Sequence, residues 1–203
     1  MSEKTNLRSY DKISAEWGKV RDAMPPNKCI EDFCKLLKPK GNVLDVGCGT
    51  GKPIAEYLTR QGFNVVGLDF SHEMIERACA NVPTAKFVEC DLFDFSCDTK
   101  FDGIIAFDSL WHLEKNCQHT VYNKLSSFMN EGAYLIFTHG THDGEIIGEM
   151  WGERFYYSAL DTNTVLELMK EAGLEIISSV ENYKEKTTGE RDLLIVARKS
   201  NQP

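Results

Sequence analysis

The amino-acid sequence predicts an α/β fold in which helices cover both faces of a mostly parallel β-sheet. From Val43 to Ala172, short apolar runs alternate with helical patterns, which is typical of parallel strands joined by helices. The closing segments 174–180 and 192–198 read as two strands joined by a loop without a helix, which predicts an antiparallel pair. The length of 203 residues suits one domain of ordinary size.

The composition is ordinary for a globular protein, with 42% hydrophobic and 27% charged residues. The net charge of −8 and the lack of a Lys/Arg cluster predict no nucleic-acid partner. No apolar run approaches the ~20 residues that span a bilayer, and no signal peptide opens the chain, so we expect no membrane partner and a cytoplasmic location. Seven cysteines without a Cys-x-x-Cys pair predict free thiols. The oligomeric state stays open between a monomer and a weak dimer.

Two helices are expected before the first strand. The first has apolar and aromatic residues at helical spacing, which alone favours core packing for them: Tyr10, Ile13, Trp17 and Val20. A Met-Pro-Pro run at 24–26 ends this helix, and Asn27 is expected to cap the second one.

Four strands in succession end in or beside an aspartate. The strands are residues 43–46, 64–68, 86–90 and 101–107, and the acids are Asp45, Asp69, Asp91 and Asp108. An isolated aspartate at a strand end is commonly a turn former or a helix cap. The carboxyl ends of parallel strands, however, meet at one edge of the sheet, where open α/β folds bind ligands. Four acids in register therefore predict a ligand site at that edge.

A glycine-rich turn follows the first strand, at Gly47, Gly49 and Gly51. Glycines here allow a tight turn and a close approach of a ligand to the backbone. The dinucleotide fingerprint would require its third glycine at Lys52, one residue later. Asp45 is also a poor neighbour for a pyrophosphate and suits an amine or another cation. The spacing therefore disfavours a nicotinamide dinucleotide.

The nonapeptide at 43–51 resembles the first motif of class I S-adenosylmethionine-dependent methyltransferases, whose cofactor carries an ammonium and a sulfonium and no phosphate. The resemblance extends over roughly residues 10–199. It implies a three-layer Rossmann-like fold with a seven-stranded, mostly parallel sheet of order 3-2-1-4-5-7-6 and strand 7 antiparallel. We expect one domain, residues 1–203, with an N-terminal helical lid at 1–40 and an inserted acceptor-side segment at 139–161.

The resemblance also implies the contacts of the cofactor S-adenosylmethionine and its product S-adenosylhomocysteine. Asp69 is expected to accept both ribose hydroxyls, Asp91 the adenine amino group, and the amide of Leu92 to meet a ring nitrogen. The phrase around Tyr10 and Trp17 is similar to the helix that covers the cofactor in many small-molecule methyltransferases. The other expected contacts are Asp45, Gly47, Cys48, Gly49, Gly51, Phe70, Met74, Phe107 and Asp108.

His112, just after the fourth strand, is the candidate general base, with packing against the cofactor as its alternative role. The cluster of His139, His142, Asp143 and Glu145 matches no metal motif, so no metal is predicted. A glycine-punctuated aromatic stretch at 144–157 is expected to fold over the site as a lid.

The predicted function is methyl transfer to an oxygen, nitrogen or carbon of a small molecule. The motif typical of enzymes that methylate base amino groups is absent, because Phe-Asp-Ser-Leu stands at 107–110. A non-catalytic S-adenosylmethionine-binding module is the main alternative. A nicotinamide-dependent oxidoreductase is a weaker one.

Overall fold

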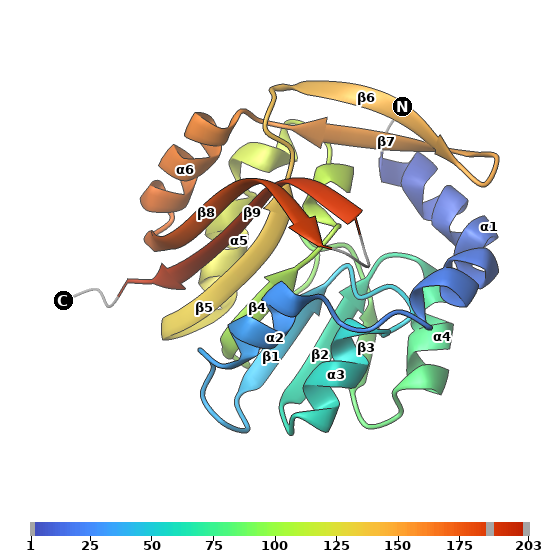
Figure 1. The fold of residues 1–203 in the computed structure, drawn as a ribbon, viewed down its shortest axis with the longest axis horizontal. Helices are drawn as coiled ribbons and strands as arrows, with labels where there is room; N and C mark the ends of the chain where they lie inside the picture. The colour runs from blue at the N-terminus through green and yellow to red at the C-terminus, as the bar shows by residue number, and fades with distance from the viewer. Residues whose placement is uncertain (1–2, 186–188, 201–203) are drawn as a thin grey trace.

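The computed structural model describes residues 3–185 and 189–200, and it has the three layers of an α/β fold (Figure 1). The strands of the main sheet are β1 (Asn42–Val46), β2 (Asn64–Asp69), β3 (Lys86–Glu89), β4 (Phe101–Ala106), β5 (Met129–His139), β8 (Leu174–Glu185) and β9 (Gly189–Lys199). Their order is β3-β2-β1-β4-β5-β9-β8. The first five strands are parallel, and β9 is antiparallel to both neighbours. The predicted strand order is confirmed.

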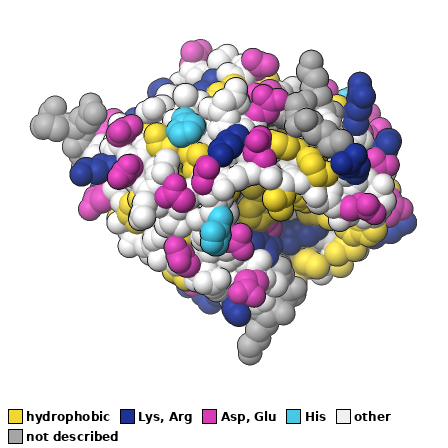
Figure 2. All heavy atoms as spheres, turned by 90° about the horizontal axis from the view of Figure 1, so that it is seen from above, with side chains coloured by type: hydrophobic (Ala, Val, Ile, Leu, Met, Phe, Trp, Pro, Cys, Tyr) yellow, Lys and Arg dark blue, Asp and Glu magenta, His cyan; other side chains and the backbone are white. Residues whose placement is uncertain are grey.

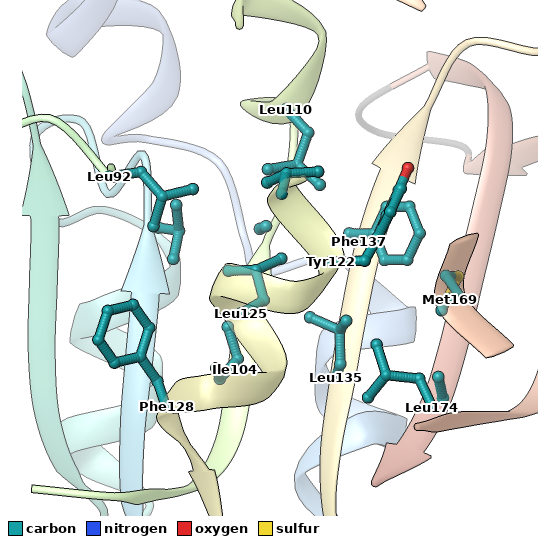
Figure 3. Packing of buried hydrophobic residues seen from close by; sticks show 14 of the residues in the cluster. Leu92, Ile104, Leu110, Tyr122, Leu125, Phe128, Leu135, Phe137, Met169 and Leu174 are labelled. Carbon is teal, nitrogen blue, oxygen red and sulfur yellow. The ribbon is translucent and has the colours of Figure 1, made fainter. Parts of the chain in front are cut away.

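Helices pack on both faces of this sheet, which explains why its central strands are almost wholly apolar. The helices α2 (Lys28–Cys34) and α3 (Ile54–Arg60) pack against one face, whose buried strand residues include Val43 and Ile105. The helices α5 (Val121–Phe128) and α6 (Thr162–Glu171) pack against the other, where Figure 3 shows Ile104 and Leu135 beside Leu125. Alternate residues of each strand therefore serve opposite cores.

The helix α4 (His72–Asn81) begins after Ser71, which caps it by accepting a hydrogen bond of 3.3 Å from the amide of Met74. The prediction that the Asn27 side chain caps α2 is wrong. Asn27 occupies the N-cap position of α2, but its side chain makes no capping hydrogen bond.

The aromatic stretch after β5 is a β-hairpin, β6 (Gly144–Met150) and β7 (Glu153–Ala159), which forms a separate two-stranded sheet. Its turn consists of Trp151 and Gly152, both with positive φ (50° and 78°), as a two-residue hairpin of the primed type requires. We predicted a lid-like segment there but no strands. Figure 1 shows the hairpin lying across the top of the main sheet beside helix α1 (Glu3–Arg21).

Helix α1 is joined to the hairpin by hydrogen bonds. The Asn6 side chain pairs with the backbone of Tyr156 as a neighbouring strand would: its Nδ2 donates to the carbonyl at 2.9 Å, and its Oδ1 accepts from the amide at 2.8 Å. Ser9 donates to the carbonyl of Arg154 at 2.7 Å, and Lys12 forms an ion pair with Glu153 at 2.9 Å. Helix α1 and the hairpin therefore form one layer above the sheet, which we call the cover.

The β8–β9 pair is longer than the predicted strands, and its additional residues reach the ligand edge. Glu185 accepts a hydrogen bond from the amide of Cys29 in α2 at 3.2 Å, and Arg191 lies beside Asp108 at the end of β4. Over residues 3–185 and 189–200, the chain contains no helix of the length and apolarity needed to cross a bilayer.

Candidate functional site

The glycine turn after β1 is tied to the end of β2. The amides of Gly47 and Cys48 both donate to the carbonyl of Leu68, at 2.7 and 3.0 Å. The turn glycines have positive φ of 73°, 53° and 76° at Gly47, Gly49 and Gly51. A Cβ at Gly49 would lie 3.6 Å from Trp17 Nε1, so this glycine leaves space beneath helix α1.

A pocket lies between this turn, helix α1 and the end of β4, near the point where the strand order reverses. Eleven of the residues predicted to contact a cofactor line it: Tyr10, Trp17, Asp45, Gly47, Cys48, Gly49, Asp69, Phe70, Met74, Phe107 and Asp108. The candidate base His112 also lines it, together with four residues that we did not predict: Arg21, Lys52, Ile54 and Ser109.

A second pocket continues from the first, because the two share Gly47, Asp69 and His112. It contains the predicted Asp91 and Leu92, with apolar walls from Leu68, Leu110 and Leu113. Asp91 uses one oxygen to accept from the amide of Phe93 at 2.6 Å, which orients the carboxylate. The acid beside apolar walls suits a flat heteroaromatic ring that carries an amino group.

Gly51 is the one predicted cofactor residue that lines neither pocket. A Cβ there would lie 3.1 Å from Phe87 Cζ and 3.3 Å from Val82 Cγ2, on the inner side of the turn. The predicted ligand contact of Gly51 therefore stays a prediction, and the structure shows a packing role for this glycine. The glycine is needed because helix α4 and β3 pack closely against the turn.

Asp69 connects the glycine turn to the start of helix α4 through hydrogen bonds. Its Oδ2 accepts from the amide of Gly49 and its Oδ1 from the amide of Ser71, both at 2.9 Å. Each oxygen keeps a second lone pair for a ligand hydroxyl. Burial raises the pKa of Asp69 to about 6, although the backbone amides of Ser71, Gly49 and Phe70 act in the opposite direction.

Asp45 is 2% exposed, and its Oδ2 has no hydrogen-bond partner among the described residues. Burial, and then the nearby Asp69, raise the pKa of Asp45 to about 7, while Arg21 partly offsets this rise. A buried carboxyl oxygen without a donor is costly, roughly 1–3 kcal/mol, unless a ligand satisfies it. The oxygen therefore fits a ligand amine, and Arg21 on the same pocket fits a ligand carboxylate.

His112 is buried and lies at the meeting point of the cover and the sheet. Its Nε2 is 2.7 Å from the Tyr10 hydroxyl, and its Nδ1 is 3.1 Å from both the Tyr156 carbonyl and Asn6 Nδ2. The tautomer with Nδ1–H donating to Tyr156 leaves Nε2 as an acceptor for Tyr10. Burial lowers the pKa of His112 to about 4, so the ring is neutral at pH 7.

Asp108 lines the pocket, but its carboxylate already has a cationic partner. Arg191 holds it through two bonds, Nε to Oδ1 at 2.5 Å and Nη2 to Oδ2 at 2.6 Å, and Thr138 adds a third at 3.2 Å. The φ of Asp108 is 57°, an uncommon value outside glycine. We did not predict this ion pair, because the strand was expected to begin at residue 192, whereas β9 begins at Gly189 and includes Arg191.

The raised pKa values of Asp45 and Asp69 predict a pH-dependent affinity for a cationic ligand. Their protonated forms dominate below about pH 6, and a cation favours the ionised forms, so binding must then release protons. The affinity for S-adenosylhomocysteine should therefore rise between pH 5 and 7.5, by at most about tenfold per unit for each proton released. Because His112 stays neutral over this range, it adds no slope. Asp45→Asn should flatten the rise near pH 7 in calorimetry, and an equally steep rise in that variant would contradict the assignment.

Residues 43–132 match a family model described as a methyltransferase domain. The putative methyltransferase YqeM of Bacillus subtilis is 37% identical over 134 residues, which are 63% of this chain and 54% of the relative. An O-methyltransferase of Pyrenophora dematioidea is 30% identical over 156 residues, 70% of this chain and 57% of the relative. The chain spans little more than half the length of these relatives.

Solved structures share the whole fold at low sequence identity. The [4+2]-cyclase SpnF aligns with a TM-score of 0.76 at 15% identity, over 100% of this chain and 98% of its own. The 1,6-didemethyltoxoflavin-N1-methyltransferase of Burkholderia thailandensis, with its namesake compound and S-adenosylhomocysteine bound, aligns with a TM-score of 0.69 at 19% identity, over 98% of this chain and 87% of its own.

The sheet order and the glycine turn define a Rossmann-like α/β protein with a ligand site at the strand ends. Together with the match of residues 43–132 to a methyltransferase domain, they give the chain the Rossmann-like methyltransferase fold.

Proposed function

We propose that the protein transfers a methyl group from S-adenosylmethionine to a small organic acceptor. The observation that carries this proposal is the buried Oδ2 of Asp45, which lacks a donor and lies on the pocket beside the glycine turn. A ligand that brings an ammonium to this oxygen and hydroxyls to Asp69 relieves the cost of both buried acids. S-adenosylmethionine carries these groups, and a nicotinamide dinucleotide would bring two phosphates instead.

Each part of the cofactor has a partner on the pocket walls. Arg21 would hold the carboxylate, Asp45 the ammonium, Asp69 the ribose hydroxyls and Asp91 the adenine amino group. When bound, the cofactor supplies a methyl carbon activated by a sulfonium. The chain's own contribution is then alignment of the acceptor, which can lower a barrier by ~7–11 kcal/mol.

His112 is proposed as the base that takes a proton from the acceptor. Its Nδ1 is held at 3.1 Å from the Tyr156 carbonyl, which fixes the ring and directs Nε2 toward Tyr10 on the pocket. The ring is neutral at pH 7 because burial lowers its pKa, so Nε2 has a lone pair that can accept a proton. With no acceptor bound, the Tyr10 hydroxyl occupies Nε2, and an acceptor hydroxyl or amine would replace it.

A lid role is proposed for the cover, helix α1 with the β6–β7 hairpin. The rings of Tyr10 and Trp17 line the pocket from above, and Trp17 lies edge-on to Trp151 of the hairpin turn at 6.2 Å. A ligand bound beneath these rings would contact both the cover and the main sheet, and would so stabilise the packing of α1 and the hairpin on the sheet. S-adenosylhomocysteine should therefore slow proteolytic cleavage within 144–159 and within α1 together. Protection of only one of the two segments would contradict their movement as a unit.

The acceptor is proposed to be a small molecule rather than a nucleic acid, and the net charge of −8 supports this. A non-catalytic S-adenosylmethionine-binding role is the second candidate, because the same fold occurs in the [4+2]-cyclase SpnF and so does not by itself establish methyl transfer. Incubation with methyl-labelled S-adenosylmethionine and a broad acceptor panel decides between them. Labelled product that is lost in Asp69→Ala supports transfer. Tight cofactor binding without any product across the panel favours the second role.

A further inference from the structure

A further cleft lies beside the cofactor pocket, at the open end of the hairpin. It has a volume of about 470 Å³, within the usual ~300–1,000 Å³ range of small-molecule sites. Its walls come from the start of β6, the end of β7, the loop after β5, the start of β9, and Trp111 after β4. Seen from above, acidic side chains lie around a hollow that holds hydrophobic and basic side chains (Figure 2). Among the described residues, those that line the cleft itself include no Lys or Arg.

Two aromatic walls connect this cleft to the candidate base. Trp111 and Tyr157 both line the cleft, and both rings contact the ring of His112, with centroid distances of 6.4 and 4.8 Å. His112 in turn lines the cofactor pocket. The cleft and the cofactor pocket are therefore separated by a single layer of rings.

The position of Tyr157 depends on a glycine across the hairpin. A Cβ at Gly148 would lie 2.9 Å from Tyr157 Cε2, so the ring rests directly on the glycine backbone. Tyr157 is only half-buried. In the layer of rings between the cleft and His112, Tyr157 comes from the hairpin and Trp111 from the segment after β4. An acceptor in the cleft would have to pass the edge of the Tyr157 ring to reach His112.

The polar part of the cleft is mostly anionic. Asp143, Glu145 and Asp192 line it, and all three are exposed. Lys115 forms an ion pair with Asp143 at 2.8 Å and so balances one of these charges. Glu145 accepts a hydrogen bond from the Tyr156 hydroxyl, which orients this carboxylate without neutralising it. The cleft therefore combines aromatic walls with an excess of negative charge, which suits an organic cation.

We propose that this cleft binds the methyl acceptor, and that the acceptor is a small aromatic compound with a protonated amine at one end and a hydroxyl at the other. The inference rests on the proposed methyl transfer. The amine lies among the carboxylates, the ring lies between Trp111 and Tyr157, and the hydroxyl reaches His112 Nε2. There the hydroxyl proton passes to Nε2 as the oxygen–methyl bond forms and the sulfur–methyl bond breaks, which leaves a neutral thioether.

The test compares three phenols of similar shape that differ in charge: tyramine, 4-ethylphenol and 3-(4-hydroxyphenyl)propanoate. Their binding to protein saturated with S-adenosylhomocysteine is measured by calorimetry at low salt. Tyramine should bind about fivefold or more tighter than 4-ethylphenol, and the carboxylate compound should bind most weakly. Asp192→Asn should weaken tyramine about two- to fivefold and leave 4-ethylphenol unchanged. Glu167→Gln, the matched loss of an exposed carboxylate on α6, should change neither.

Trp111→Ala should weaken tyramine and 4-ethylphenol by the same factor, because it removes a wall and no charge. Equal binding of the three phenols, absence of binding, or an Asp192→Asn variant that behaves like wild type would each overturn the proposal. Binding of S-adenosylhomocysteine is measured first. Its failure would overturn the proposed function as well, whereas its success without a preference for the amine overturns this inference alone.

Discussion

Replacing Asp69 with alanine is expected to weaken S-adenosylhomocysteine binding by about 1.5–3 kcal/mol, or roughly 10- to 150-fold, the range for hydrogen bonds to a charged group. The side chain is 8% exposed, faces the pocket and offers lone pairs to the ribose hydroxyls. It also holds the amide of Gly49, so the variant loses part of the turn that the ligand contacts. Calorimetric titration of the variant measures the loss.

The matched control for this variant is Ser71→Ala. The amide of Ser71 donates to Oδ1 of Asp69, and the Ser71 hydroxyl caps helix α4. Ser71 lines neither pocket. Its replacement should lower the free energy of unfolding by about 1 kcal/mol and leave the affinity nearly intact. Equal losses of affinity in the two variants would mean that Asp69 acts only by anchoring the turn.

Replacing His112 with alanine is expected to lower turnover by about two orders of magnitude, the usual contribution of proton transfer. Cofactor affinity should change little, because the Nε2 atom is bonded to Tyr10 and not to a strand-end acid. A packing role would instead reduce affinity at least as much as turnover. Steady-state kinetics together with calorimetry on the same sample separate the two roles.

Tyr10→Phe is the companion variant, because it keeps the ring and removes only the hydroxyl at 2.7 Å from Nε2. If that hydroxyl merely occupies the base until an acceptor arrives, turnover should stay within a few-fold of wild type. A loss as large as that of His112→Ala would show that the proton passes through Tyr10, which would contradict the role assigned to this hydroxyl.

The parts of the site that were predicted from the sequence are those that local patterns encode. Apolar runs, glycines with a fixed spacing and the acids Asp45, Asp69 and Asp91 all follow from the strand–turn–helix unit, and the structure brings them to one edge. Alternation and the closing loop predicted the parallel sheet and its antiparallel end, whereas the strand order was implied by the resemblance to methyltransferases.

The parts that were missed depend on contacts between distant segments. Tyr10 meets His112 across 102 positions, and Asn6 meets Tyr156 across 150, so no spacing rule connects them. Arg21 is one of two basic residues in the last turn of α1, with Lys19, and basic residues are common there because they interact favourably with the helix dipole. Arg191 reaches Asp108 only because β8 and β9 extend beyond their apolar segments, which the hydrophobic pattern does not show.

The most direct test of the central claim is a calorimetric comparison of S-adenosylmethionine, S-adenosylhomocysteine and NADH on the unmodified protein. We expect S-adenosylmethionine and S-adenosylhomocysteine to bind, and NADH to bind at least about tenfold more weakly. Three features predict this order: Asp45 Oδ2 has no hydrogen-bond donor among the described residues, Asp69 is oriented by two amide donors, and position 52 is not a glycine. NADH binding as tightly as S-adenosylmethionine, or more tightly, would contradict the assignment of this pocket.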